Sequence, residues 1–119
     1  MCGIVGLFNL NNAPIEDLVV TTRMTSNLIH RGPDDEGFLK DGPLAFGFRR
    51  LSIIDLEGGH QPVANETNTV WAMLNGEIYN FVELRDELQS CGHQFRTKSD
   101  TEVIVHAYES FGLNFVEKL

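Results

Sequence analysis

Apolar residues in the first half of the chain form short runs that end at glycine, proline or asparagine. The run GIVGLFNL at 3–10 predicts a buried strand. From Pro14 to Ile29 the apolar residues recur at the spacing of an amphipathic helix, with two acidic residues at its start. The segment RGPDDEG at 31–37 predicts a break, because Gly-Pro cannot continue a helix. Residues 38–50 then predict two strands joined by a tight turn.

The second half alternates between strand-like and helix-like patterns. Residues 51–56 predict an extended segment, and 69–75 form the most strand-like run in the chain. Between them, the glycine- and proline-containing segment 57–62 predicts a loop. A further short strand is expected at 93–97.

Three helices are expected in this half. The first follows Asn80, which can cap a helix, and ends at Gly92. Its expected apolar face comprises Leu84, Leu88 and Cys91. The second opens at the capping box SDTE (99–102) and ends at Gly112. Its expected apolar face comprises Val103, Ile104, Ala107, Tyr108 and Phe111. A third would begin at Asn114 and run off the end after too few turns to be stable, so we expect a truncated chain.

The composition is typical of a globular domain. The chain has 119 residues, of which 42% are hydrophobic and 22% charged, enough for one small domain. Its net charge of −8 argues against nucleic-acid and anionic-membrane partners, because both attract basic surfaces. No apolar run reaches membrane-spanning length, and the start lacks the basic region of a signal peptide. We therefore expect a cytoplasmic protein.

The two cysteines, Cys2 and Cys91, are too few for a disulfide framework, so both are expected to be free thiols. Removal of Met1 would leave Cys2 with a thiol and a free α-amine. An α-amine titrates near neutral pH, so one residue could supply both nucleophile and base. The alternative is a small buried hydrophobe near a chain end. Cys91 is expected to pack within its helical face.

Several other polar residues have both a chemical and a structural interpretation. The Asn75 amide and the Gly76 N–H could form an oxyanion hole, although Asn-Gly is also the commonest short hairpin signal. Arg50 could clamp a carboxylate, or could lie solvated at a strand end. Asp100 could bind an ammonium group or stabilise a helix start, and Glu77 has the same two interpretations.

The sequence does not predict a metal site. The four histidines are His30, His60, His93 and His106. No Cys-x-x-Cys pair or paired-His helix motif accompanies them, and CGH at 91–93 is a weak zinc signal by itself. DDE at 34–36 lacks the ligand spacing of a calcium loop and is expected to be a polar turn. The glycines do not match a phosphate-binding loop. We expect no metal and no cofactor in this chain.

The blocks MCGIVGLF, HRGPDDEG, RLSIIDLEGGHQP, NGEIYN and SDTEVI occur in this order and cover nearly the whole chain. Together they closely resemble the class II glutamine amidotransferase domain, which has an N-terminal nucleophile. HRGPDDEG and RLSIIDL are most similar to the domain of glutamine-hydrolysing asparagine synthetases. The resemblance implies an α+β fold, an Ntn-hydrolase-like αββα sandwich of antiparallel sheets flanked by helices, incomplete at its C-terminal side.

The resemblance also implies a role for each matching residue. Cys2, freed from Met1, would attack the side-chain amide of glutamine and form a γ-glutamyl thioester. Asn75 and the Gly76 N–H would stabilise the oxyanion. The implied substrate contacts are Arg50 at the α-carboxylate, Glu77 and Asp100 at the α-ammonium, and main-chain groups near Ile53 and Ile54.

By this resemblance, residues 1–119 would be the N-terminal portion of the amidotransferase domain. The synthetase domain, which resembles ATP pyrophosphatases and would bind ATP, magnesium and aspartate, would be absent. Glutamine and a separate synthetase domain or chain are the expected partners. Two alternatives stay open: a truncated, non-catalytic fragment, and a module of another class II enzyme with a different ammonia acceptor.

Overall fold

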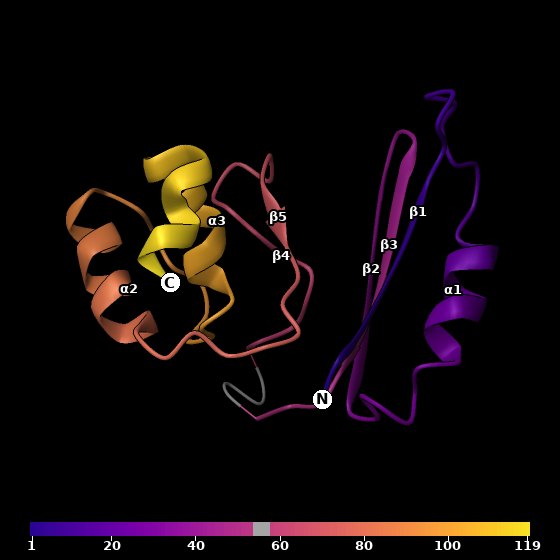
Figure 1. Ribbon diagram of the computed structural model, residues 1–119, viewed down its shortest axis with the longest axis horizontal. Helices are drawn as coiled ribbons and strands as arrows, with labels where there is room; N and C mark the ends of the chain where they lie inside the picture. The colour runs from indigo at the N-terminus through magenta and orange to yellow at the C-terminus, as the bar shows by residue number, and fades with distance from the viewer. Residues whose placement is uncertain (54–57) are drawn as a thin grey trace. The chain divides into compact units, whose positions relative to one another are not determined.

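The computed structural model describes residues 1–53 and 58–119 (Figure 1). The chain packs into two compact units. The N-terminal unit comprises Met1–Ser52 and His60–Pro62, and the C-terminal unit comprises Ile53–Gly59 and Val63–Leu119. Each unit has a β-sheet of its own with a helix packed on it.

The N-terminal unit is a three-stranded antiparallel sheet in the order β1-β3-β2. Its strands are β1 (Gly3–Phe8), β2 (Asp35–Asp41) and β3 (Leu44–Arg50). A tight turn at Gly42, where φ is +50°, joins β2 to β3. The predicted strands at 3–10 and 38–50 are thus confirmed, although β2 begins inside the segment that we expected to break the chain.

Helix α1 (Val19–Ser26) packs against β1 and β3 (Figure 1). It is shorter than the apolar spacing predicts, which placed the helix start at Pro14. The Ile15 N–H donates to the Gly42 carbonyl at 2.8 Å and holds the preceding segment against the β2–β3 turn. Asp17 Oδ1 then accepts the Val19 N–H at 2.9 Å, which satisfies one of the free donors at the helix start.

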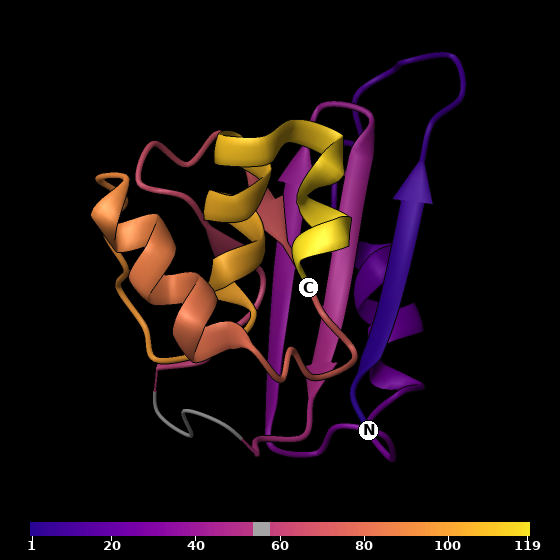
Figure 2. The same ribbon diagram turned by 60° about the vertical axis from the view of Figure 1, so that its left-hand side comes forward.

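Helix α3 (Glu102–Phe111) is central to the C-terminal unit (Figure 2). It contacts α2 (Phe81–Ser90), the 3₁₀ helix η1 (Gly112–Lys118), and a two-stranded sheet of β4 (Val63–Ala64) and β5 (Trp71–Ala72). The buried core of the unit comprises Ile78, Leu84, Leu88, Val103 and Ala107. Because these residues come from α2, α3 and the segment before α2, the core fixes the two helices against each other.

Two strand predictions in this unit need correction. The predicted strand at 69–75 is reduced to Trp71–Ala72. The predicted strand at 93–97 is wrong, because that segment has no regular structure. Its backbone N–H groups donate to side chains instead: Gln94 to Glu66, and both Arg96 and Thr97 to Glu102. Carboxylates therefore accept the hydrogen bonds that the backbone of a neighbouring strand would otherwise accept.

The first two of the three helices predicted in this half form, and they end at Gly92 and Gly112 as expected, both of which have positive φ. Their predicted caps do not form. Asn80 precedes α2, but its side-chain amide donates to the carbonyl at the end of η1 at 2.7 Å. The Glu102 carboxylate binds N–H groups upstream instead of returning to Ser99, so no capping box closes.

The predicted helical faces are only partly correct. Leu84 and Leu88 are buried, whereas Cys91 is exposed, so the expectation that it packs is wrong. On α3, Tyr108 is half-exposed, while Glu102 and His106 are fully buried. The final helix begins at Gly112 instead of Asn114 and is 3₁₀. Of the extended segment expected at 51–56, residues 51–53 have no regular structure and 54–56 lie outside the described residues.

At the level of fold class, the chain is a mixed α and β structure with antiparallel sheets. None of the helices in the described part of the chain has the length and apolar character needed to cross a membrane.

Candidate functional site

Cys2 lies immediately before β1 and is half-buried. Its Sγ accepts the Leu51 N–H at 3.4 Å and lies 3.8 Å from the Leu51 carbonyl oxygen. The Cys2 carbonyl accepts a hydrogen bond from Arg31 Nε at 3.0 Å. Both the thiol and the backbone of this residue are therefore held in place, unlike those of a typical chain end, which fray.

Arg50 lies at the same end of the β1–β3 pair as Cys2. It is the last residue of β3, and the adjacent rung of the ladder pairs Gly3 with Arg49. The Arg50 residue is only 5% exposed, so the interpretation as a solvated strand-end arginine is wrong. The neighbouring Arg49 has a structural role, because it forms an ion pair with Glu36 at 2.8 Å.

Gly32, in the HRGPDDEG block, shows how this block supports that end of the sheet. A Cβ at this position would collide with the backbone of Arg49 and Arg50. The absence of a side chain lets the Gly32 carbonyl accept a hydrogen bond from Arg49 Nε at 2.8 Å. The following Asp34 donates its N–H to the Arg50 carbonyl and accepts the Ser52 N–H on Oδ2. The block thus fixes the backbone on both sides of Arg50.

Asn75, Gly76 and Glu77 lie in an exposed bend between β5 and α2. The chain continues into a helix after this bend, so the interpretation of Asn-Gly as a hairpin turn is wrong. Gly76 does not have positive φ, and an added Cβ would only reach ordinary contact with the Leu74 side chain, at 3.4 Å. The local fold therefore does not require glycine here.

Asp100 holds this bend in place. Its side chain is buried, and its Oδ2 accepts the Ile78 N–H at 3.0 Å, directly after Glu77. Its Oδ1 accepts hydroxyl hydrogen bonds from Ser99 and Thr101, each at 3.4 Å. No side-chain hydrogen bond caps α3, so Asp100 does not stabilise the helix start as a cap. Within the C-terminal unit, Asp100 and the segment 75–77 are brought together.

The remaining predicted contacts involve the segment after β3. Ile53 is exposed, and Ile54 lies outside the described residues. Cys2 and Arg50 thus form one part of the predicted site within the N-terminal unit. Asp100 and the bend at 75–77 form the other part within the C-terminal unit.

Residues 1–119 match the family model of the glutamine amidotransferase domain over their whole length. The chain belongs to this family. Among curated proteins, it is 46% identical to asparagine synthetase [glutamine-hydrolyzing] 1 of Bacillus subtilis and 44% identical to that organism's second such enzyme. It is 41% identical to asparagine synthetase [glutamine-hydrolyzing] 1 of Arabidopsis thaliana. All of this chain is covered in each comparison, but only 19%, 16% and 20% of the respective relatives.

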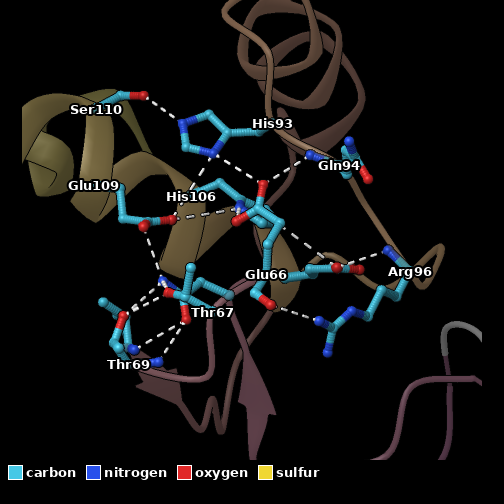
Figure 3. A network of polar contacts seen from close by, with 12 residues as sticks. Glu66, Thr67, Thr69, His93, Gln94, Arg96, His106, Glu109 and Ser110 are labelled. Atoms are coloured by element: carbon cyan, nitrogen blue, oxygen red, sulfur yellow. Dashed lines mark hydrogen bonds and ion pairs between the residues drawn. The ribbon is translucent and has the colours of Figure 1, made fainter.

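The amidotransferase chain also contains a polar cluster that the sequence analysis did not predict. Glu66, His93, His106 and Glu109 each place a possible ligand atom within 4.8 Å of the others (Figure 3). His106 and Glu109 are one helical turn apart on α3, the spacing at which side chains share a face. That pair is the sequence signal that could have revealed half of the cluster. Glu66 and His93 come from irregular segments that no periodicity marks.

The environment lowers the pKa of Glu66, a member of this cluster, and of Glu102, which lies next to it. Burial alone would raise the pKa of Glu102, but contacts with the His106 ring and with the Arg96 and Thr97 N–H groups lower it to about 2. Burial alone would also raise the pKa of Glu66, but the hydrogen bond from the Gln94 N–H and the nearby histidines lower it. Both side chains are therefore held as carboxylates in the folded unit.

Proposed function

We propose that this amidotransferase chain hydrolyses glutamine with Cys2 as the nucleophile, once Met1 has been removed. The α-amine of Cys2 takes the thiol proton as sulfur attacks the side-chain amide carbon. The C–N bond then breaks, a γ-glutamyl thioester forms, and the amine returns the proton to the departing ammonia. Water hydrolyses the thioester to glutamate and restores the thiol.

The placement of Cys2 is the observation that carries this proposal. The residue is second in the chain and half-buried, and a backbone N–H donates to its sulfur. Such a contact favours a developing thiolate. Arg50 at the same strand end is positioned by the HRGPDDEG block, and its guanidinium has the planar geometry that binds a carboxylate with two parallel hydrogen bonds. We assign it to the α-carboxylate of glutamine.

The exposed bend before α2 supplies the complementary groups in this proposal. The Asn75 amide and the Gly76 N–H would stabilise the oxyanion of the tetrahedral intermediate. Support for Gly76 comes from the absence of any conformational need for glycine at this position. Glu77 and Asp100 would bind the α-ammonium group, and backbone groups of Ile53 and Ile54 would add further contacts.

For the ammonia, we propose aspartate as the acceptor, amidated to asparagine on a synthetase domain or chain that binds ATP and magnesium. The names of the curated relatives support this proposal. This chain spans about a fifth of their length. We also propose that the two antiparallel sheets belong to an Ntn-hydrolase-like αββα sandwich, and that residues 1–119 form its first portion. The glutamine reaction itself would need no cofactor.

The decisive experiment combines intact mass with an assay of glutamate release. We expect a mass that lacks Met1, and glutamate release that Cys2→Ala reduces to background. Cys91→Ala is the matched control, because Cys91 is an exposed thiol outside the predicted site. Retention of Met1, or equal release by the wild type and Cys2→Ala, would overturn the proposal in favour of a non-catalytic fragment.

A further inference from the structure

We propose that the C-terminal unit binds one divalent metal ion of the zinc class between Glu66, His93, His106 and Glu109, as a structural site. The four side chains converge from three segments: the loop after β4, the segment after α2, and α3 (Figure 3). Two imidazoles and two carboxylates form a donor set that suits Zn²⁺. This metal site is independent of the proposed glutamine chemistry and differs from our expectation of no metal from the sequence.

Four of the separations between donor atoms, at 3.3–3.8 Å, lie close to those around a tetrahedral ion. Glu66 lies 3.3 Å from Nδ1 of His93 through Oε1, and 3.3 Å from Nδ1 of His106 through Oε2. Glu109 Oε2 lies 3.8 Å from both Nδ1 atoms. Zn–N and Zn–O bonds of about 2.0–2.2 Å in tetrahedral geometry place neighbouring ligand atoms about 3.3–3.6 Å apart.

His106 provides the independent indication that something occupies the centre of this cluster. The side chain is fully buried, and neither ring nitrogen has a hydrogen-bond partner among the described residues. Nδ1 points at Glu66 and Glu109, and Nε2 lies 3.6 Å from Glu102 Oε1. A buried polar group without a partner destabilises a fold, so such groups are rare.

The charges around His106 point in the same direction. Both of its nitrogens face carboxylates, but a neutral imidazole carries only one N–H, so one lone pair would face negative charge. A cation between the ligands would receive that lone pair and balance the surrounding carboxylates.

Three of the four proposed ligands are also oriented by hydrogen bonds from outside the cluster. The Gln94 N–H donates to Glu66 Oε1 at 2.8 Å, and the Asn65 amide donates to Glu109 Oε1 at 2.8 Å. His93 Nε2 lies 2.8 Å from Ser110 Oγ. Outer contacts of this kind are what hold metal ligands in geometry. Because all four positions come from the protein, the site is closed and its role is structural.

Zinc binding can be measured on the full chain after EDTA treatment. We expect calorimetry with zinc chloride to give one equivalent per chain at micromolar affinity or tighter, with a rise in melting temperature. Glu109→Gln keeps the side-chain shape and removes one charged ligand, so it should weaken binding at least tenfold. His60→Gln is the matched control, because His60 contacts Asp35 at 2.7 Å in the other unit. This variant should bind zinc like the wild type.

The zinc K-edge absorption spectrum of the wild type reports which atoms bind the ion, so it tests the proposal even if Glu109→Gln fails to fold. Nitrogen and oxygen ligands with imidazole scattering would support the proposal, whereas sulfur ligands would assign the zinc to Cys2 or Cys91. The double substitution Cys2→Ser, Cys91→Ser should leave the stoichiometry unchanged. No stoichiometric binding, or equal weakening by His60→Gln, would overturn the proposal.

Discussion

Single carboxylates stabilise irregular segments of the C-terminal unit. Glu102 is the clearest case: fully buried at the start of α3, it accepts the Arg96 and Thr97 N–H groups and the Thr97 hydroxyl. One carboxylate thus accepts backbone N–H groups that would otherwise bond to a neighbouring strand if 93–97 were a strand. Such a group stabilises the fold only while it is ionised.

The pKa of Glu102 predicts how stability changes with pH. Its folded pKa is about 2, below the ordinary 4.5, so its contribution is present above pH 4.5 and is lost as pH falls towards 2. The difference corresponds to about 3 kcal/mol. Chemical denaturation in EDTA should show that the free energy of unfolding of the wild type falls across this pH window. Glu102→Gln should be less stable than the wild type at pH 7, and its free energy of unfolding should change less as the pH falls. An unchanged slope in Glu102→Gln would contradict this.

The glycines at 32 and 76 should respond differently to substitution by alanine. Gly32→Ala places a Cβ against the Arg49 and Arg50 backbone, so the free energy of unfolding should fall by about 1–3 kcal/mol or more. Gly76→Ala meets only Leu74 at ordinary contact distance, so stability should change by less than about 0.5 kcal/mol. Glutamate release by Gly76→Ala should nevertheless fall. Denaturation curves and the glutaminase assay together check both expectations.

Among the elements, the bend between β5 and α2 depends on a contact from the start of α3. Asp100 Oδ2 accepts the Ile78 N–H, so the position of the bend follows the position of the helix. The Asn80 amide adds a bond to the carbonyl of Lys118, which ties the start of α2 to η1. These links explain how an exposed segment can present Asn75 and Gly76 in a defined geometry.

Two substitutions at Asp100 separate its structural contact from its proposed role at the substrate. Asp100→Asn retains an oxygen acceptor for the Ile78 N–H, so the melting temperature should change little. Loss of the negative charge should raise KM for glutamine. Asp100→Ala leaves the N–H unpaired and should lower the free energy of unfolding by about 1–3 kcal/mol. If Asp100→Asn bound glutamine as well as the wild type, the proposed ammonium contact would be wrong.

At the scale of the whole molecule, each compact unit contributes its own part of the predicted site. The N-terminal unit carries the proposed nucleophile and the proposed carboxylate-binding arginine. The C-terminal unit carries the proposed oxyanion-binding bend and the proposed ammonium-binding residues. The family match covers all residues of both units. The proposed glutaminase reaction therefore uses residues of both units.

The whole-chain proposal predicts which product forms from a full set of substrates. With glutamine, aspartate, ATP and magnesium, residues 1–119 by themselves should release glutamate and ammonia without forming asparagine, because the amidation step is assigned to a synthetase domain. Amino-acid analysis by mass spectrometry would check this. The same mixture with Cys2→Ala is the control, and asparagine formation by residues 1–119 alone would contradict the assignment.

Local patterns predicted much of the fold. Alternating and continuous apolar runs indicated β1 and the β2–β3 hairpin, and helical spacing with terminal glycines indicated α2 and α3. These features depend on neighbours close in sequence. The strand at 93–97 and the two predicted caps failed because distant groups, such as Glu66 and the Lys118 carbonyl, take the hydrogen bonds that local rules assign to neighbours.

The sequence by itself determined the family, the candidate nucleophile at Cys2 and the helices of the C-terminal unit, because each depends on residue order and short-range periodicity. Only the tertiary structure decided that Arg50 is buried at the strand end next to Cys2, that Asp100 accepts the Ile78 N–H, and that four side chains place possible ligand atoms within 4.8 Å of one another. These contacts join residues far apart in sequence. Their energies depend on burial and distance, which exist only once the chain has folded.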